Sequence, residues 1–593
     1  MNSVFDIQDI EVEDEGSTFS VRQCLERGEE GRTALVQSVR NLLTLLNDGM
    51  DFGVETAEIW ARYLGLLIRG RAPDLSDPYS DLKHYRYEPV TKALAQDTPF
   101  PALRFLNDLP DRPMAPSRSE TKLVLNQTLL ILAVGGADST FYSGLSSDET
   151  NALEKCLFSD AVRECFPKRD GFGRGIPRAF ASKTSRRDET ATILGSMALQ
   201  AYNAGIRNAA LICNSKTFQP IQNYIRKEFD SLKDMRWIFP VQPLFPVIRL
   251  DSGAKTGRVT IKNGAYPGGH GHGFQISILH ESVQRNVQTG VLKHFIFANG
   301  DNLALLNWGG NHLARMIVET EREKSGVRTA LLLVWETFRK GGFAYKLTRP
   351  ETGASHGQII EAELAGASRI SLKETETNQV GYNTNSAFGQ IRAVQKHLGV
   401  LPMALKLKRA EGIDGYVLES SISSVLGLRQ DKDGVSSFEP GAMLYFLPPE
   451  WAVFPHWSHI SIRKRGDLFT FLTSLFRVRT LNTPCGNFPV IVTERTAAVN
   501  HPVLEGNVLN PGVLDTKAFI EIFRSAEIDA DDFTGVLKID LLEEKCRPRG
   551  RIRFRGNIRL IGSGTVSITV PAGETWTIEN RTIQSPAVVM AGN

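Results

Sequence analysis

Two histidines stand among four glycines in the stretch YPGGHGHGF, residues 266–274. If this stretch were a strand, His270 and His272 would lie on one face and could bind Zn²⁺. Four glycines instead permit positive φ angles and a close approach of the backbone to a ligand. Because no cysteine or carboxylate lies close by in the sequence, the pattern favours a glycine loop that faces a ligand, and the zinc site is the lesser alternative.

A second stretch, FANGDNL (297–303), places Asp301 directly after an apolar run. A lone carboxylate at the end of a strand suits Mg²⁺, which usually takes one or two protein carboxylates together with substrate phosphates. The alternative is that Asp301 caps a following helix, since aspartate is a good N-cap residue. The motif alone leaves both interpretations open.

Basic residues gather in RKGG (339–342), ALKLKR (404–409) and SIRKRGDL (461–468). A site that handles several phosphates needs such charges aimed at non-bridging oxygens. Any single one of them is more often a solvated surface residue. The three clusters beside apolar runs therefore give phosphate binding only some support.

Apolar runs that end in polar residues predict the sheet that would carry these side chains. The runs at 121–136, 208–215, 291–303 and 328–335 are typical of buried strands, and residues 189–205 are typical of a helix. Strands that alternate with helices predict a mostly parallel, doubly wound sheet, in which ligands bind beyond the carboxyl ends of the strands. The loops GGADST, NSKT, NGDN and WETFRKGG are therefore candidate site loops.

The flanking regions have different patterns. Residues 34–48 and 55–69 have helical periodicity, and we take 1–118 as an N-terminal helical arm. Residues 550–583 form short β-branched runs at near-even spacing, which predicts coils of a β-solenoid. The predicted division is 1–118, a main α/β domain over 119–475, and a C-terminal β domain over 476–593.

Composition narrows the classes of protein. The net charge is only +3, which gives no case for nucleic-acid binding. No apolar run approaches the roughly 20 residues needed to span a bilayer, and the acidic N-terminus is unlike a secretory signal. The six cysteines form no CxxC pair, so free thiols in a reducing cytoplasm fit best.

Five stretches follow one another in a recognisable order: PGGHGHG (267–273), FANGDNL (297–303), RKGG (339–342), GYNTNS (381–386) and the tail 550–583. In that order they resemble the nucleoside loop, the Asn-Ser-Asp-Asn-Leu strand end, the Lys-Gly-Gly and Phe-Asn-Thr-Asn-Asn motifs and the β-helix of the UTP–glucose-1-phosphate uridylyltransferases, also called UDP-glucose pyrophosphorylases. The resemblance covers residues 120–590.

The resemblance implies an α/β fold, with a Rossmann-like nucleotidyltransferase domain built on a mostly parallel mixed sheet and a C-terminal left-handed β-helix. It implies a reaction that joins a sugar 1-phosphate, either glucose 1-phosphate or a sugar-like analogue, to an NTP, UTP by default. The products would be an NDP-sugar and pyrophosphate. The resemblance also implies Mg²⁺ as the cofactor. An exposed β-helix end could pair with a second copy of the chain, so a homo-oligomer stays open.

The resemblance also assigns roles to individual residues. Asp301 would hold Mg²⁺ and act in catalysis with Lys408, Lys464 and Arg178. The nucleotide would be bound by Gly135, Gly136, Gln242, Gly269 and His270. The sugar would be bound by Asn385, Lys340, Gly342 and Glu419.

The sequence also departs from the family at three places. Asp138 replaces a glycine of the triphosphate loop, which adds a negative charge where phosphates should lie. Arg178 stands for a family lysine, and His272 stands for an aspartate. Three hypotheses follow: an active nucleotidyltransferase with an altered substrate, a catalytically impaired relative that binds nucleotide or NDP-sugar, and a zinc-dependent enzyme that uses His270 and His272.

Overall fold

A computed structural model gives the arrangement of the chain. The structure describes residues 8–14, 17–68, 86–91, 103–105, 118–136, 146–166, 176, 180, 191–250, 255–302, 314, 317, 329–336, 342–348, 350–351, 353, 355–361, 380–395, 398, 404–410, 413–422, 428–430, 436–438, 442–446, 476–493, 503–509, 522, 526–533 and 535–590.

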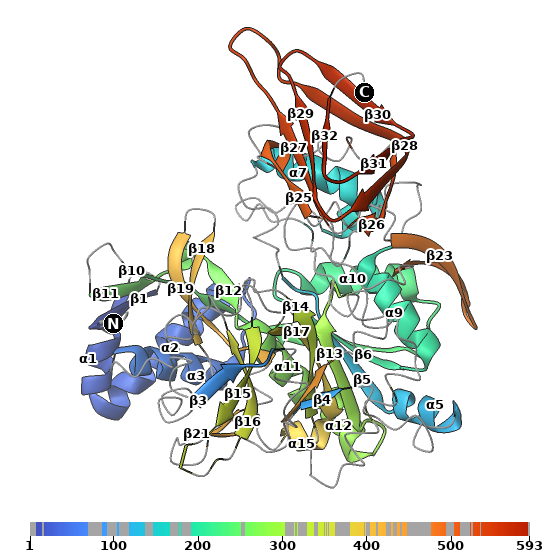
Figure 1. Ribbon diagram of the computed structural model, residues 1–593. Helices are drawn as coiled ribbons and strands as arrows, with labels where there is room; N and C mark the ends of the chain where they lie inside the picture. The colour runs from blue at the N-terminus through green and yellow to red at the C-terminus, as the bar shows by residue number, and fades with distance from the viewer. Residues whose placement is uncertain are drawn as a thin grey trace.

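A mixed sheet of twelve strands runs through the middle of this part of the chain (Figure 1). Its strands are β3 Arg86–Pro89, β4 Leu103–Phe105, β5 Thr128–Ala133, β6 Asn208–Asn214, β7 Arg236–Ile238, β8 Val241–Gln242, β13 His294–Asn299, β14 Thr329–Glu336, β15 Gly342–Thr348, β16 Ser355–Glu361, β17 Val380–Gln390 and β22 Ala442–Phe446. The main path runs β4-β22-β14-β17-β13-β5-β6-β7. Strands β13, β5, β6 and β7 are parallel, whereas β17 is antiparallel to β13 and β14. The predicted mixed α/β sheet is therefore confirmed.

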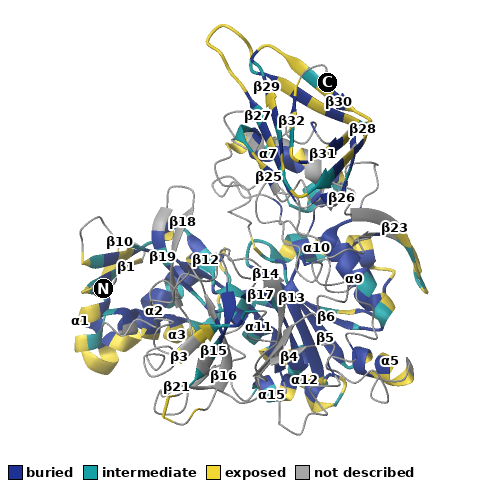
Figure 2. Cartoon of the chain, viewed as in Figure 1, coloured by how far each residue is buried: buried dark blue, intermediate teal, exposed yellow. Residues whose placement is uncertain are grey.

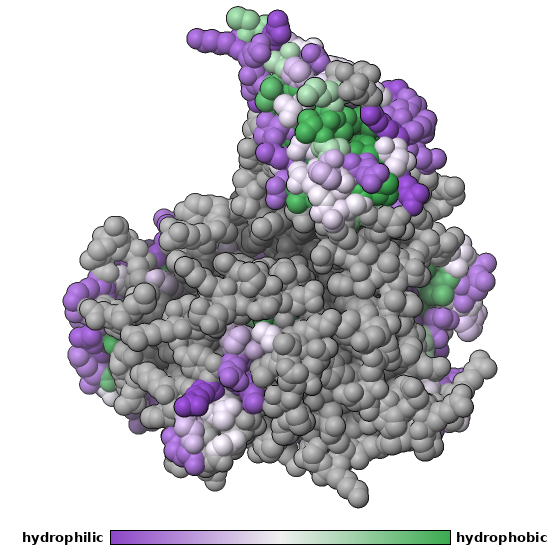
Figure 3. Space-filling model, viewed as in Figure 1, coloured by the Kyte–Doolittle hydropathy of each residue, from purple (hydrophilic) through white to green (hydrophobic). Residues whose placement is uncertain are grey.

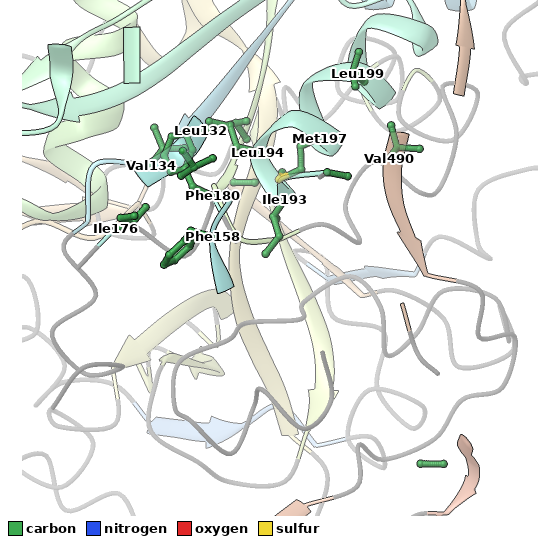
Figure 4. Close-up of a cluster of buried hydrophobic side chains, with 14 of the residues drawn as sticks. Leu132, Val134, Phe158, Ile176, Phe180, Ile193, Leu194, Met197, Leu199 and Val490 are labelled. Atoms are coloured by element: carbon green, nitrogen blue, oxygen red, sulfur yellow. The ribbon is translucent and has the colours of Figure 1, made fainter. Parts of the chain in front are cut away.

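Helices cover both faces of this sheet. They are α9 Ile193–Ala204, α10 Phe218–Phe229, α11 Gly269–Leu279 and α12 Glu281–Gln288. Leu130 and Leu132 of β5 join one hydrophobic core with α9 and α10, whereas Leu129 and Ile131 join a second core with α11 and α12. Figure 4 shows the first core around Leu132. Because both faces are covered, β5 is a continuous apolar run instead of an alternating one, and each fully buried leucine stabilises the fold by about 1.5–3 kcal/mol.

Helix α9 has clear start and stop signals. The hydroxyl oxygen of Thr192 accepts a hydrogen bond from the N–H of Gly195 at 2.8 Å, which makes Thr192 the N-cap. Gly205 ends the helix at φ 114°, a conformation that favours glycine. The helix predicted over 189–205 is thus confirmed, with its start four residues later than expected.

The N-terminal segment packs against the main domain through a second sheet. Its elements are β1 Asp9–Asp14, β2 Ser17–Ser20, α1 Val21–Glu26, α2 Gly28–Leu46 and α3 Gly53–Ile68, and the sheet also takes β10 Ile248–Leu250, β11 Thr256–Val259, β18 Ala404–Ala410 and β19 Ile413–Glu419. Strand order is β18-β19-β10-β11-β1-β2, with β1 parallel to β11. The two predicted helices are confirmed as α2 and α3, and strands accompany them.

Asn47, which ends α2, fixes this segment to the main domain. Its side-chain oxygen accepts from the backbone N–H of Leu244 at 2.8 Å and from the hydroxyl of Ser215 at 3.1 Å. Asn47 is fully buried and its bond to Leu244 is shielded from water, so removing the side chain would leave a buried backbone N–H unpaired. The N-terminal segment thus holds the loop that follows β6.

The C-terminal region is built from stacked parallel strands. They are β25 Val503–Glu505, β26 Ala526–Phe533, β27 Val536–Leu541, β28 Arg551–Gly562, β29 Thr565–Val570, β30 Thr575–Glu579, β31 Thr582–Gln584 and β32 Ala587–Val589. One stack runs β25-β27-β29-β32 and another joins β26, β28, β30 and β31, all in parallel pairs. Buried and exposed residues alternate along β28 (Figure 2), so Phe554 and Leu560 point inward. The parallel stacking of these short strands is thus established, and the left-handed β-helix stays a prediction.

The surface of the C-terminal region, seen in Figure 3, carries hydrophilic side chains along its margins with hydrophobic ones gathered between them.

The remaining described elements are α5 Arg118–Asn126, α7 Ser147–Leu157, α8 Asp160–Cys165, β9 Leu244–Pro246, η4 Ile261–Asn263, β12 Ala265–Pro267, α15 Ile391–Gln395, β20 Leu428–Gln430, β21 Ser436–Phe438, β23 Phe476–Thr483, β24 Gly486–Thr493 and η7 Asn507–Leu509. Among the helices in the described ranges, none has the length and apolar character to cross a membrane. The predicted boundaries at 118 and 475 stay a prediction.

Candidate functional site

The carboxyl ends of β5 and β13 lie side by side, since the two strands are parallel and Asn299 pairs with Ala133. After β13 the chain turns at Gly300, whose N–H donates to the carbonyl oxygen of Ala133 at 3.0 Å. A Cβ on Gly300 would collide with Val134, so this turn requires glycine. The turn sets Asp301 beside the end of β5, where Gly135 and Gly136 follow. Asp301 is half-buried, and it ends up at the sheet edge predicted for it.

The loop after β5 is also tied to the next strand, β6. The side-chain N–H of Asn214 donates to the carbonyl oxygen of Gly135 at 2.6 Å. A Cβ on Gly135 would lie 3.0 Å from the backbone of Cys213, so the close approach of the two strand ends needs glycine here. Gly136 has open space around it and is exposed. The predicted loops GGADST and NSKT therefore contact each other. Of the first loop, the structure describes Gly135 and Gly136.

Gly268 and Gly269 begin α11 and lie against the end of β19. The N–H of Ser420 donates to the carbonyl oxygen of Gly268, and the N–H of Gly271 donates to that of Ser420, both at 2.8 Å. Gly269 has φ +82°, and a Cβ there would lie 2.5 Å from the Ser420 carbonyl oxygen and 3.2 Å from Cβ of Glu419. The structure thus brings Gly269 and Glu419 together.

Gln242 and His272 form a buried pair beside this helix start. The side-chain N–H₂ of Gln242 donates to the carbonyl oxygen of Gly269 at 2.8 Å and lies 3.3 Å from Nδ1 of His272. Gln242 is 5% exposed and His272 8%. Burial lowers the pKa of His272 to about 4, because a desolvated imidazole resists protonation. His272 is therefore neutral near pH 7.

The zinc alternative does not fit this geometry. His270 and His272 lie in the first turn of helix α11, two positions apart, so their side chains leave the helix in different directions. The ring of His270 lies near Phe297 at 6.3 Å, whereas that of His272 lies near Phe245 at 5.4 Å. No group of three or more metal-binding side chains occurs among the residues that the structure describes. Residues 269–273 also start a helix instead of continuing as a loop.

Asn385 lies at an irregularity in β17, close to the Asp301 turn. Leu332 of β14 pairs with Ser386 of β17, but the next residue of β14 pairs with Asn383. Asn385 is therefore one of two residues of β17 left out of the pairing. Its φ is +54°, and its N–H donates to the side-chain oxygen of Asn383 at 3.0 Å. Such bulges often redirect a side chain at a site.

A hydrogen bond joins this bulge to the turn after β13. The side-chain N–H of Asn302 donates to the hydroxyl oxygen of Ser386 at 3.1 Å, and both residues are fully buried. The neighbours of Asp301 and Asn385 are therefore linked directly. The predicted metal residue and the predicted sugar residue lie on two elements that hold each other in place.

The other predicted residues are placed less completely. Gly342 begins β15, where the next residue, Phe343, pairs with Tyr382, so Gly342 lies near the start of the Asn385 bulge. Lys408 lies in β18, of which the structure describes the backbone. Lys340, Arg178 and Lys464 lie outside the described residues, as does Asp138.

Three polar residues at the site went unassigned in the sequence analysis: Asn302, Ser386 and Ser420. Each is buried, and each bonds to a neighbour of a predicted site residue. The signal that could have found them is their place in quoted stretches, because Asn302 follows Asp301, Ser386 follows Asn385 and Ser420 follows Glu419. Asn214 lies in the predicted loop NSKT but was likewise not assigned as a site residue.

Comparisons with known proteins bear on the fold. No protein-family pattern matches this chain, and no curated protein sequence matches it. Among solved structures, the UDP-glucose pyrophosphorylase of Leishmania major superposes with a TM-score of 0.56 at 13% identity, over 93% of this chain and 99% of that one. The UDP-glucose phosphorylase of Trypanosoma brucei gives 0.55 at 14% identity, with the same coverage. A third match, at 0.56 and 14% over the same shares of the two chains, is an L. major mutant in complex with UDP-glucose.

The fold is thus one already known from solved structures. In particular, the chain shares the fold of the UDP-glucose pyrophosphorylases along nearly its whole length, as its motifs predicted. At 13–14% identity the sequence is a divergent one.

Proposed function

We propose that this protein is a nucleotidyltransferase that joins a sugar 1-phosphate to an NTP, UTP by default, and releases pyrophosphate. The observation that carries the proposal is that Gly135, Asp301 and Asn385 lie at one edge of the sheet, where hydrogen bonds of their neighbours join the elements that carry them. Gly269 is tied to the same edge through Gln242, which pairs with Asn214 and donates to the Gly269 carbonyl oxygen. Ligands of open α/β sheets bind at this edge. The shared fold with UDP-glucose pyrophosphorylases supports the same class.

The glycine side of the site would take the nucleotide. Gly269 removes side-chain bulk where α11 begins, and the N-terminal end of this helix carries a partial positive charge that favours anions. Gln242 and His270 would lie against the nucleoside. Gly135 and the exposed Gly136 would lie beside the phosphates.

The transfer itself needs little covalent chemistry from the protein. An oxygen of the sugar phosphate attacks the α-phosphorus of the NTP in line, the bond to the β-phosphate oxygen breaks, and pyrophosphate leaves. The work of the chain is to align the two substrates and to stabilise the charge that develops. Lys408, Lys464 and Arg178 would supply positive charge to the phosphates.

Asp301 would hold the cation that such a reaction uses. Its carboxylate and the side-chain oxygen of Asn299, which has no hydrogen-bond partner among the described residues, are hard oxygen donors of the type that Mg²⁺ prefers. Bound Mg²⁺ would neutralise phosphate charge and orient the reacting oxygens. Only one carboxylate is needed, because substrate phosphates provide the other ligands.

The sugar would lie between the β17 bulge and the end of β19. Asn385, half-buried with its carboxamide near Asn383, would bind sugar hydroxyls together with Lys340, Gly342 and Glu419. A carboxamide both donates and accepts, so it suits many hydroxylated rings. Glucose 1-phosphate is the first substrate to test.

The second candidate is a relative that binds nucleotide or NDP-sugar without turnover. Two departures in the sequence favour it: Asp138, in place of a loop glycine, and His272, in place of an aspartate. A carboxylate about 4 Å from a phosphate of the NTP would weaken nucleotide binding by on the order of a few kcal/mol.

Exchange of radiolabelled pyrophosphate into NTP separates the two candidates. The exchange is measured on the full chain with Mg²⁺, across UTP, CTP, ATP and GTP and a panel of sugar 1-phosphates that includes glucose 1-phosphate. If the protein is an active transferase, labelled pyrophosphate should enter the NTP only when a matching sugar 1-phosphate is also present. Measurable nucleotide binding with no exchange for any pair would instead establish the binding relative.

A further inference from the structure

Arginine is concentrated in one stretch of the C-terminal region. Residues 547–559, RPRGRIRFRGNIR, hold six arginines in thirteen positions and include most of β28. Residues 535–590 contain nine basic and five acidic residues, a net charge of +4, whereas the whole chain carries +3. The excess positive charge of the protein therefore lies in this region, and the remainder of the chain has a net charge of −1.

Half of these arginines are neutralised inside the protein. The ion pairs are Arg547–Glu544, Arg549–Glu543 and Arg559–Asp529. The other three, Arg551, Arg553 and Arg555, are exposed and form no ion pair with any residue in the described part of the chain. We call these three residues the arginine row. Its charges are available to an anion from outside the protein.

The arginine row lies on one outward face of β28. Buried and exposed residues alternate along this strand, so that Ile552 and Phe554 point into the core between the arginines. Successive arginines are two residues apart, which is about 6.6 Å in a parallel strand, and the row is about 13 Å long. Like charges held at this spacing repel one another. An anion laid along the row would offset this repulsion.

The neighbouring strand β30 adds hydroxyl groups and one carboxylate to this face. Its exposed residues Thr575, Thr577 and Glu579 pair in register with the three arginines. A threonine hydroxyl can donate to an anion that the arginines hold. Glu579 stands opposite Arg555, and no ion pair joins these two described residues. With this carboxylate included, the face has a net charge of +2.

This arrangement of charges favours a planar anionic partner. Near an anionic bilayer each arginine strengthens binding about fivefold, or about 1 kcal/mol, whereas exposed ion pairs with the single carboxylates of a peptide contribute little. Single-stranded nucleic acid is usually bound with aromatic side chains on which the bases stack. None of the exposed side chains of β28 and β30 is aromatic. A bilayer asks only for charges on one plane, which an outward strand face presents.

We propose that the face of β28 and β30 that carries the arginine row is a docking surface for a bilayer with anionic lipid headgroups. The headgroup phosphates and carboxylates would lie against the arginines, with Thr575 and Thr577 donating beside them. The net charge of +2 corresponds to about thirtyfold stronger binding, so the contact is reversible. The surface lies on the C-terminal region, apart from the twelve-stranded sheet (Figure 1), and the proposal does not depend on the proposed function.

Vesicle sedimentation tests the proposal on the full chain. Vesicles of phosphatidylcholine alone are compared with vesicles that also contain phosphatidylserine. Binding to the phosphatidylserine vesicles should be about thirtyfold tighter at low salt. It should weaken as salt is added, because ions screen the attraction. Equal binding to the two kinds of vesicle would overturn the proposal.

Replacement of the whole row then assigns the binding to it. R551Q/R553Q/R555Q should abolish the preference for phosphatidylserine, with the fold retained because all three side chains are exposed. The matched control, R22Q/R32Q/R62Q, removes the same charge from exposed arginines of α1, α2 and α3, at the other end of the molecule (Figure 1). The control should keep the preference. Equal losses in the two triple variants would show that only the total charge matters and would overturn the proposal.

Glu579→Gln should change binding in the opposite direction. Removal of the carboxylate that faces Arg555 should strengthen binding to phosphatidylserine vesicles about fivefold, a gain that damage to the fold would not produce. Glu505→Gln is the control, because Glu505 is also exposed but lies in β25, in the other stack of strands. Unchanged binding in Glu579→Gln, or an equal gain in the control, would contradict the proposed surface.

Two further probes identify the class of partner. A DNA oligonucleotide, single-stranded or duplex, and a peptide of alternating glutamate and serine are titrated into the wild type and R551Q/R553Q/R555Q under the same conditions. Neither should bind in a way that depends on the row as strongly as the phosphatidylserine vesicles do. Tighter row-dependent binding of the oligonucleotide or of the peptide would assign the surface to that partner and overturn the bilayer proposal.

Discussion

At the start of α11 the chain leaves little freedom: Ser420 pairs with the backbone on both sides of Gly269, and His272 and Gln242 are buried against each other. At the turn after β13, by contrast, Asp301 and Asn385 are both half-buried, and only their neighbours Asn302 and Ser386 are fully enclosed. The first region is held by close backbone approach. The second is held by side-chain hydrogen bonds beneath an open edge.

The difference fits two tasks. Discrimination between similar bases needs groups that cannot readjust, because a flexible site would satisfy the wrong ligand as well. A transfer site needs polar groups that reach the substrates but are oriented from behind by others. The variants below test whether the two regions have these separate roles.

The largest effect is expected from Asp301→Ala. Loss of the carboxylate that would hold Mg²⁺ should lower pyrophosphate exchange on the order of a thousandfold, with the fold retained because Asp301 is half-buried. Exchange rates and circular dichroism together check this. Asp230→Ala, at the exposed end of α10, is the control. Normal exchange in Asp301→Ala would remove Asp301 from the site.

Gly269→Ala should damage the first region selectively. The new Cβ would meet the Ser420 carbonyl oxygen at 2.5 Å while the backbone has φ +82°, so we expect a loss of about 1–3 kcal/mol in the free energy of unfolding and weaker nucleotide binding. Urea unfolding and calorimetry measure the two.

Gly290→Ala is its control, since Gly290 has φ +75° but nothing within 4 Å. In this variant only the strain of an alanine at positive φ should lower the free energy of unfolding, by about 1 kcal/mol. Its nucleotide affinity should be unchanged. If both variants behave alike, close approach at Gly269 has no role of its own.

Asn302→Ala should loosen the second region. The bond to Ser386 orients the bulge that carries Asn385, so the KM for the sugar 1-phosphate should rise about tenfold, the effect of one buried hydrogen bond, while nucleotide affinity stays constant. Ser386→Ala should cause a similar change. The double variant should add little to either single one, and additive effects would show that the bond does not couple the residues.

The smallest effect is a pH dependence of stability from His272. Burial lowers its pKa from 6.5 to about 4, so the unfolded chain binds the proton more readily and stability falls as pH drops through this window. Between about pH 7 and pH 5.5 one such group should cost about 1 kcal/mol.

Urea unfolding at the two pH values checks this dependence in the wild type and in His272→Asn. The variant should lose that part of the slope. His294, whose pKa burial also lowers to about 4, should contribute separately. A slope equal in the variant and the wild type would contradict the assignment to His272.

The sequence was most informative where the signal is local. The apolar run that ends at Asn299 gave β13 and the turn with Asp301, because a buried parallel strand needs continuous apolar residues. The C-terminal strands were also predictable, since buried Phe554 and Leu560 belong to a strict alternation along β28.

Contacts between distant segments were not predictable. Glycine disfavours helix, yet α11 begins at Gly269 because Phe274 and Ile278 are fully buried behind it and packing outweighs propensity. Neither the pairing of Gly268 with Ser420 nor the bulge at Asn385 leaves a local pattern. These tertiary contacts decide which side chains meet at the site.

The bond between Asn47 and Leu244 spans 197 residues, which has a consequence for synthesis of the chain. At roughly 5–20 residues per second, Leu244 leaves the ribosome about ten to forty seconds after Asn47. During that interval the apolar faces of α2 and α3 lack the strands that bury them in the finished core. We therefore expect the N-terminal segment to expose apolar surface on the nascent chain during this interval.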